Sequence, residues 1–241
     1  MQVALSVVVP VKDEAENIAP LAREIAAAIA TESAAEIVFV DDGSGDATAR
    51  TLTELKPQLP QLRIIQHSRN MGQSRAVRTG VRAARGELIV VLDGDGQNDP
   101  ADIPKLVQEF RASNAPRLGL VQGQRATRKD SAQKRIASRL ANRIRRRVLN
   151  DGADDVGCGL KAFPRDAFLA LPYFDHMHRY MVALMLREGF EVRFVEVNHR
   201  PRLHGRSKYG VWDRLVVGVT DLMGVRWLQR RHRGVVETEE L

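Results

Sequence analysis

Short apolar runs recur along the first hundred residues and predict buried strands. The clearest run is Leu88 to Leu92, an unbroken series typical of a strand that a parallel sheet covers on both faces. Comparable runs predict strands over residues 3–9, 36–40, 62–66 and 87–92. Because Pro10 lacks the backbone N–H that a strand ladder uses, we expect it to end the first strand.

The residues between these runs show the periodicity of helices. Ile18, Leu21, Ile25 and Ile29 recur at helical spacing and predict a helix over residues 15–30. Further helices are expected from Asp46 to about residue 56, after Gly72, and from Pro100, with Asp99 as the N-cap. Four strand–helix units in succession predict an α/β fold with a doubly wound, mostly parallel sheet.

The second half of the chain extends this sheet with antiparallel additions. Its expected elements are a strand over 118–122, a basic helix over 131–149, a return strand over 156–163, a helix over 177–188, a strand over 190–196 and a basic loop over 200–210. We therefore expect residues 1–210 to form a single domain.

Residues 211–241 are predicted to be a separate amphipathic helix with an acidic tail. Trp212, Met223 and Trp227 lie near one helical face, and Arg230 and Arg231 close the helix. This combination suits a helix lying on a membrane surface, and its internal charges argue against a membrane span. A helix packed on the core or forming a dimer is the alternative.

Composition narrows the class of partner. Lys and Arg outnumber Asp and Glu by 37 to 30, and the net charge of +7 favours anionic partners such as phosphates or anionic lipids. Aromatic residues make up 5% of the chain without a stacking motif, which argues against nucleic acid. We see no signal peptide and no uncharged apolar run of about 18 residues. We therefore expect a cytoplasmic protein, peripheral on the cytoplasmic face of the membrane.

Carboxylates follow two of the predicted strands. Asp93 and Asp95, with Gln97 nearby, come after the strand at 87–92 and form an oxygen-only ligand set that suits Mg²⁺ or Mn²⁺. The alternative is a solvated Asp-Gly turn. Asp41 and Asp42 end the second strand and are candidates to accept hydrogen bonds from a base or ribose. A turn is the alternative there, although Asp46 can cap the next helix and leave this pair free for a ligand.

The order and spacing of four segments resemble glycosyltransferase family 2: residues 8–18, 40–48, 69–72 and 93–100. Lys12-Asp13 stands where that family often has an aromatic residue followed by Asn, and Gly94 stands where Ala is commoner. Within the family, Arg125 and residues 135–138, 155–159 and 205–209 resemble the dolichol-phosphate (polyprenyl-phosphate) mannosyltransferase group. The resemblance covers about residues 5–210 and implies a GT-A type fold with a Rossmann-like nucleotide-binding half.

The resemblance also implies a set of site residues. A divalent cation would be held by Asp93, Asp95 and Gln97 beside the diphosphate of a nucleotide-sugar donor. The donor pocket would comprise Pro10, Val11, Glu14, Asp41, Asp42, Asn70, Gly72 and Asp93.

The cations expected to bind the acceptor phosphate are Arg125, Arg135, Arg139, Arg206 and Lys208. Of these, Arg125, Arg206 and Lys208 are also expected, with Asp93 and Asp95, to be catalytic. A phosphate acceptor is already an anion, so no strong general base is required.

The function implied is an inverting transfer of a hexose, most plausibly mannose from GDP-mannose, to a polyprenyl phosphate. One alternative is a UDP-sugar donor (glucose or N-acetylglucosamine) with a lipid phosphate or soluble acceptor. Another is a non-catalytic relative that binds a nucleotide or a membrane. A homodimer or a separate membrane-protein partner is also compatible with the sequence.

Overall fold

The strands form one seven-stranded sheet in a computed structural model. It describes residues 3–32, 34–125, 143, 145–153, 155–202 and 211–234, and for residues 211–217 it describes the backbone alone. The strands are β1 Leu5–Val11, β2 Ala35–Asp41, β3 Leu62–Gln66, β4 Leu88–Val91, β5 Leu118–Arg125, β6 Lys161–Pro164 and β7 Glu191–Val197. Their order is β3-β2-β1-β4-β6-β5-β7. Neighbours pair in parallel except at β6, which is antiparallel to both β4 and β5.

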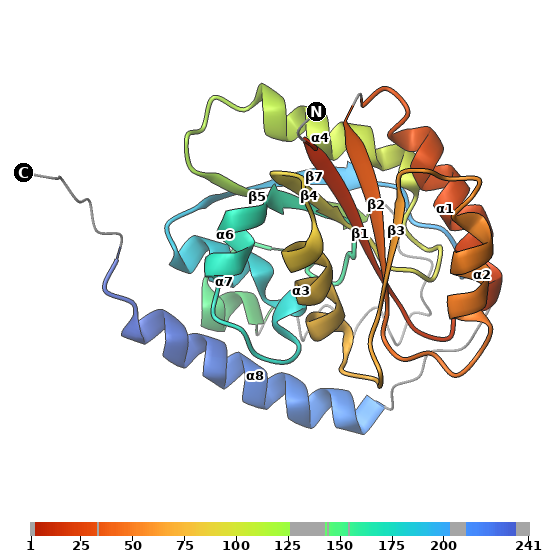
Figure 1. The fold of residues 1–241 in the computed structure, drawn as a ribbon. Coiled ribbons are helices and arrows are strands. Elements are labelled where there is room, and N and C mark those ends of the chain that lie inside the picture. Colours follow the sequence, from red (N-terminus) through yellow and green to blue (C-terminus); the bar gives the residue numbers. More distant parts are fainter. Residues whose placement is uncertain are drawn as a thin grey trace, which may run out of the picture.

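Helices cover both faces of this sheet (Figure 1). They are α1 Ala15–Ala28, α2 Thr48–Leu55, α3 Gln73–Ala83, α4 Ile103–Ala112, α6 Arg165–Ala170, α7 Met181–Arg187 and α8 Val211–Arg231, with 3-10 turns η1 Pro100–Asp102 and η2 Met177–Arg179. One core lies against α1, α2 and α4, and the other against α3, α6 and α7. Alternate residues of β1 enter opposite cores, Val7 and Val9 the first and Val8 the second. The doubly wound α/β prediction is confirmed.

The chain reverses direction across the sheet at β1. It passes from β1 through β2 to β3, and then returns over α3 to β4 on the other side of β1. Crossovers that leave a central strand in opposite directions open a crevice at the carboxyl ends of the strands, where α/β proteins bind ligands. The loops after β1, β2 and β4 therefore meet at one edge.

The prediction that Pro10 ends the first strand is wrong, because β1 continues through Pro10 to Val11. The carbonyl of Val8 accepts a hydrogen bond from Leu92, so alternate residues of β1, Pro10 included, direct their backbone polar groups toward β4. Val8 is the last residue of β1 that pairs with β4. Proline therefore removes no ladder hydrogen bond at this position.

The second half follows the sequence expectation with three differences. The return strand is antiparallel as predicted, but it begins at Lys161 and not at residue 156. Helix α6 was missed because six residues carry barely one helical repeat. The helix expected over 177–188 divides into η2 and α7. Residues 145–149 are helical, whereas most of the basic helix predicted over 131–149 lies outside the described residues.

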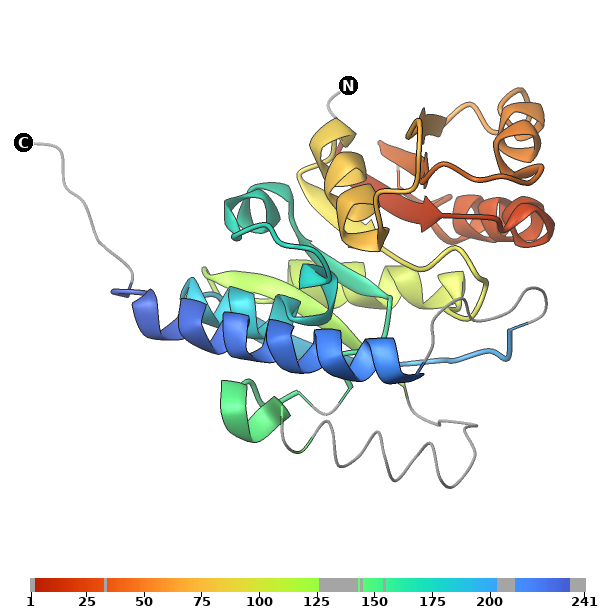
Figure 2. The same cartoon turned by 90° about the horizontal axis from the view of Figure 1, so that it is seen from below.

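Helix α8 runs along the outside of the molecule beside α7 (Figures 1 and 2). Val225 is fully buried, and the Tyr180 hydroxyl donates a 3.0 Å hydrogen bond to the carbonyl of Gly218. Val219, Met223 and Trp227 remain exposed on the outward face. None of the helices in the described part of the chain is sufficiently long and apolar to cross a membrane.

Candidate functional site

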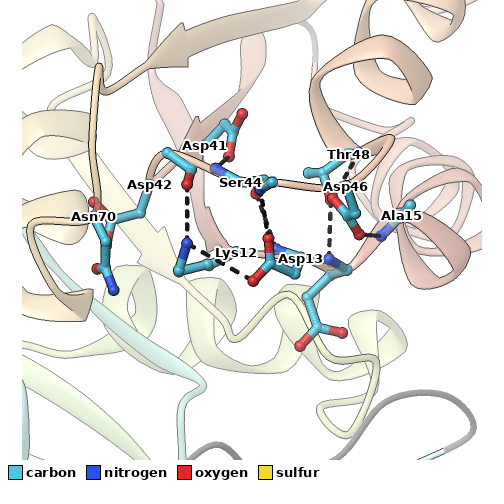
Figure 3. A network of polar contacts seen from close by, with 12 residues as sticks. Lys12, Asp13, Ala15, Asp41, Asp42, Ser44, Asp46, Thr48 and Asn70 are labelled. Carbon is cyan, nitrogen blue, oxygen red and sulfur yellow. Dashed lines mark hydrogen bonds and ion pairs between the residues drawn. The ribbon is translucent and has the colours of Figure 1, made fainter.

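The loops after β1 and β2 are joined by hydrogen bonds (Figure 3). Lys12 Nζ donates to the carbonyl of Gly43 at 2.9 Å. Asp13 Oδ1 accepts from the Gly45 N–H at 2.7 Å, and the Asp13 N–H donates to Ser44 Oγ at 2.9 Å. The two residues that depart from the family pattern, Lys12 and Asp13, thus brace these loops against each other.

The predicted donor residues at the end of β1 differ in exposure. Pro10 and Val11 are buried, and Val11 packs where Gly94 lacks a side chain. A Cβ at Gly94 would lie 2.4 Å from Val11 Cγ1, so Val11 leaves no room for alanine there without a shift. The Glu14 carboxylate accepts hydrogen bonds from Asn17 Nδ2 at 2.6 Å and from Arg202 at 3.0 Å.

Asp41 and Asp42 both accept hydrogen bonds from the protein, and their role in binding a base or ribose stays a prediction. Asp41 is fully buried and accepts hydrogen bonds from the Ser44 N–H and Gln66 Nε2.

The Asp42 carboxylate also has partners within the protein. It accepts hydrogen bonds from the backbone N–H groups of Met71 and Gly72, both at 2.8 Å, and lies 2.7 Å from His67 Nδ1. Because these bonds fix the loop after β3, Asp42 positions the predicted donor residues Asn70 and Gly72. Gly72 adopts a φ of 86°, which favours glycine.

Asp93 follows β4 and is held from three sides. Gln73 Nε2 donates to its Oδ1 at 2.7 Å, and Asn98 Oδ1 accepts from its N–H at 3.1 Å. Gly159 lies against the carboxylate: a Cβ there would be 2.2 Å from Asp93 Oδ2. Burial and repulsion from Asp95 raise the pKa of the Asp93 carboxyl, against the attraction of Lys161.

Asp95 is tied to the loop after β1 through Arg202. Its Oδ1 accepts from the Gln97 N–H at 3.1 Å, and its Oδ2 forms an ion pair with Arg202 at 3.1 Å. Arg202 also pairs with Glu14 at 3.0 Å, so one guanidinium neutralises carboxylates from two loops. The carbonyl of Gln97 accepts from the Arg200 N–H, which keeps residues 200–202 beside the site.

Lys161 is a site residue that the sequence analysis missed. It is 5% exposed in the antiparallel strand β6, donates to the carbonyl of Cys158, and burial lowers the pKa of its ammonium group. Its charge attracts the Asp93 carboxylate. A lysine inside an apolar strand was the available signal, and only the antiparallel pairing with β4 places it near Asp93.

Among the predicted phosphate-binding cations, the structure describes only Arg125. Its guanidinium forms a bidentate ion pair with the buried carboxylate of Asp155, at 2.6 and 2.7 Å. This pair fixes the direction of Arg125 at the end of β5. The other predicted cations, Arg135, Arg139, Arg206 and Lys208, lie outside the described residues.

The donor set fits a magnesium-type ion that substrate oxygens complete. The described residues contain no cluster of three or more His, Cys, Asp or Glu side chains suited to a metal. Two carboxylates, Asp93 and Asp95, nevertheless lie close enough for their negative charges to repel each other. The positive charges of Lys161 and Arg202 offset part of this negative charge. Mg²⁺ commonly takes one or two carboxylates together with phosphates and water. Asp93 and Asp95, with the Gln97 side chain, would hold such an ion.

Comparison with known proteins matches the part of the chain that contains Asp93, Asp95 and Lys161. A family model described as glycosyl transferase family 2 matches residues 6–171. The dodecaprenyl-phosphate galacturonate synthase of Rhizobium johnstonii is 36% identical over 94% of this chain and 67% of its own length. The undecaprenyl-phosphate 4-deoxy-4-formamido-L-arabinose transferase of Edwardsiella ictaluri is 37% identical over 86% of this chain and 63% of its own length. The chain therefore spans roughly two thirds of the length of these relatives.

Solved structures confirm the expected GT-A type fold. Glucosyl-3-phosphoglycerate synthase from Mycobacterium tuberculosis, in complex with Mg²⁺ and UDP, matches with a TM-score of 0.70 at 17% identity, covering 94% of this chain and 79% of that one. Its complex with Mn²⁺, UDP and phosphoglyceric acid gives a TM-score of 0.69 at 18% identity, covering 94% of this chain and 78% of that one. The two relatives above also bear out the resemblance to transferases that act on polyprenyl phosphates.

Proposed function

Because this chain belongs to glycosyltransferase family 2, we propose that it transfers a sugar from a UDP-linked donor to a polyprenyl phosphate. The observation that carries the proposal is the pair Asp93 and Asp95 at the carboxyl end of β4, held by Gln73, Asn98 and Arg202. Relatives named for polyprenyl-phosphate substrates support the acceptor.

The comparisons favour the alternative donor over mannose from GDP-mannose. The relatives are named for galacturonate and for 4-deoxy-4-formamido-L-arabinose, and the solved structures of similar fold were obtained with UDP. We therefore replace the mannose prediction with a UDP-linked sugar.

Asp93 and Asp95 would bind the donor through its diphosphate. A divalent cation held there would neutralise the charge that develops on the departing diphosphate. The structure supports this role through the fixed direction of Asp93: Gln73 holds one oxygen, and Gly159 leaves room for the other. Lys161 and Arg202 add positive charge on two sides of the carboxylate pair.

The acceptor phosphate would attack the anomeric carbon directly. Since the phosphate is already an anion, the protein needs cations to bring two anionic substrates together and needs no general base. Arg125, aligned by Asp155, is the described candidate, and Arg135, Arg139, Arg206 and Lys208 remain proposed ligands. A single displacement of this kind inverts the anomeric centre.

The C-terminal helix is the proposed membrane contact. Val219, Met223 and Trp227 form an exposed stripe along α8, and Arg226, Arg230, Arg231 and Arg233 lie around its end. Apolar side chains flanked by arginines match the chemistry of an anionic membrane surface. A peripheral position there would bring a lipid acceptor to the enzyme.

The test is transfer from UDP-sugars and from GDP-mannose to undecaprenyl phosphate, followed by mass spectrometry of the lipid product. We expect product from a UDP-sugar, and we expect Asp95→Asn to lower kcat by at least about 100-fold, as for the loss of one strong electrostatic contact. Asp166→Asn is the matched control, because that side chain is 93% exposed on α6. Transfer only from GDP-mannose, or full activity of Asp95→Asn, would contradict the proposal.

A further inference from the structure

A cavity of about 490 Å³ lies between the loop after β3 and the α6–α7 connection, residues 171–180. Its lining includes Gly72 and Gln73 from the first side and Asp175 and His176 from the second. Pockets of this size are typical of small-molecule sites. The relative position of these two segments therefore sets the shape of the cavity.

The α6–α7 connection contacts the start of α3 at two residues. Asp175 lies against Gly72, where an added Cβ would be 3.3 Å from Asp175 Oδ1. Ser74 Oγ lies 2.7 Å from His178 Nδ1 and accepts a hydrogen bond from the His178 N–H at 3.4 Å. Because Gly72 and Ser74 flank Gln73, the connection supports the chain on both sides of this glutamine.

Gln73 in turn fixes the direction of Asp93. Its Nε2 donates to Asp93 Oδ1 at 2.7 Å. The N–H of the preceding residue, Gly72, donates to the Asp42 carboxylate at 2.8 Å. The turn at Gly72 is thus in contact with Asp42 and with Asp175. A displacement of this turn would move Gln73, and with it the carboxylate that is proposed to anchor the donor.

Helix α8, which runs below α3 and α7 in Figure 1, reaches the cavity wall through Asp221. Asp221 Oδ2 lies 3.2 Å from His176 Nδ1, and the Asp221 side chain is 17% exposed. Burial raises the pKa of the Asp221 carboxyl, and attraction by His176 and Arg179 acts against this rise. Both of these partners line the cavity.

The backbone of His176 is held in an uncommon conformation. Its φ of 64° lies in the left-handed region, which residues other than glycine adopt at some cost in energy. The His176 N–H donates to Asp175 Oδ1 at 2.9 Å, while the ring contacts Asp221. The contact with Asp221 therefore helps to hold the turn that places Asp175 against Gly72.

We propose that Asp221 is a positioning residue of the donor site, so that binding of the UDP-linked donor requires the C-terminal helix. The inference rests on the proposed function and extends its site beyond the family model, which ends at residue 171. Asp221 acts through His176 and the turn at Gly72 and does not itself contact the donor.

The experiment measures the Kd of UDP in the presence of Mn²⁺ by calorimetry. Asp221→Asn removes the charge but keeps the shape of the side chain, and should raise the Kd at least about tenfold, as for residues that orient the ligands of a metal site. His176→Asn should have a similar effect, because asparagine tolerates a positive φ. The double variant should bind UDP no more weakly than the weaker single variant, since both substitutions remove one contact.

Kinetics separate positioning from a loss of folded protein. With undecaprenyl phosphate as acceptor, Asp221→Asn should raise the KM for the UDP-sugar that the wild type uses and leave the KM for the lipid unchanged. A purely structural role would lower the free energy of unfolding in urea and leave both KM values as in the wild type. That result would overturn the inference.

Tyr180→Phe is the matched control. The Tyr180 hydroxyl donates to the carbonyl of Gly218 at 3.0 Å, so this variant also loses a contact between α8 and the α6–α7 connection. Tyr180 is not among the described residues that line the cavity, and its variant should bind UDP as the wild type does. Equal weakening in Tyr180→Phe would assign the effect to docking of α8 in general and would overturn the inference.

The remaining outcomes separate this inference from the proposed function. Unchanged UDP binding in Asp221→Asn and His176→Asn would overturn the inference and leave the proposed function intact. Additive losses in the double variant would show that the two residues act separately, and would also overturn it. Absence of Mn²⁺-dependent UDP binding in the wild type would refute the proposed function and the inference together.

Discussion

Gly159 controls the position of Asp93 because the two residues leave no space for a side chain between them. A Cβ at Gly159 would lie 2.2 Å from Asp93 Oδ2 and 2.6 Å from Asn98 Oδ1. We expect Gly159→Ala to displace the Asp93 carboxylate and weaken Mn²⁺-dependent nucleotide binding by at least about tenfold, since metal sites tolerate small displacements poorly. Isothermal titration calorimetry measures this directly.

Gly218→Ala is the control for that substitution. Gly218 lies in α8, and no atom of the residues that the structure describes lies within 4 Å of the added Cβ. Unchanged nucleotide binding in Gly159→Ala would show that Asp93 does not need its present position.

At the scale of single residues, the sequence predicts which chemical groups lie at the site better than it predicts the hydrogen-bond and ion-pair partners of those groups. Asp93 and Asp95 lie at the expected edge because a strand of apolar residues precedes them. Asp41 and Asp42 look equally available in the sequence, yet both carboxylates accept hydrogen bonds from donors in β3 and in the loops after β2 and β3. The approach of Lys161 to Asp93 and the ion pair of Arg202 with Asp95 depend on segments far apart in the chain, so no local pattern predicts them.

At the scale of elements, Glu36 joins β2 to its neighbours. Its buried carboxylate accepts hydrogen bonds from Ser6 Oγ at 2.7 Å and the Arg85 N–H at 2.6 Å, and pairs with Arg63 at 2.7 Å. Burial alone would raise the pKa of Glu36, but these hydrogen bonds and the charge of Arg63 outweigh it and lower the pKa.

We expect Glu36→Gln to lower the free energy of unfolding by about 1–3 kcal/mol at neutral pH. A carboxylate with a lowered folded-state pKa stabilises the fold above its unfolded-state pKa and loses that effect as the pH falls through the folded value. The difference between wild type and variant should therefore shrink in acid, below the ordinary range of glutamate.

Urea unfolding at neutral and acidic pH measures both effects. The control is Glu54→Gln, whose side chain is 68% exposed on α2 and pairs with Arg50 on the surface. A pH-independent difference between wild type and Glu36→Gln would contradict the assignment.

The elements themselves were largely predictable because strands buried on both faces carry continuous apolar runs. The predictions that failed were those that depend on neighbours in space. Pro10 is tolerated in β1 because β4 has already ended beside it. Helix α6 is too short to show a period, and a sheet and a second helix give its Phe168 a core to enter.

At the scale of the whole molecule, α8 has two apolar faces. Val225 is buried in the core, while Val219, Met223 and Trp227 are 55%, 62% and 57% exposed. We expect the protein to sediment with vesicles that contain anionic lipid and Met223→Glu to weaken this binding by about tenfold or more, since burying one such side chain contributes about 1.5–3 kcal/mol.

The control for vesicle binding is Gln108→Glu, which adds the same charge at an exposed position of α4, across the sheet from α8. Equal vesicle binding by Met223→Glu and wild type would contradict the membrane assignment. A change from dimer to monomer in Met223→Glu, without vesicle binding by the wild type, would assign the stripe to contact between two copies.

The central claim is that Asp93 and Asp95 anchor the diphosphate of a UDP-linked donor. Calorimetric titration with UDP and with GDP, each with and without Mn²⁺, tests it most directly. We expect UDP to bind in the presence of Mn²⁺, GDP to bind more weakly, and Asp95→Asn to abolish the metal dependence. Preference for GDP, or binding of neither nucleotide with Mn²⁺ present, would contradict the account.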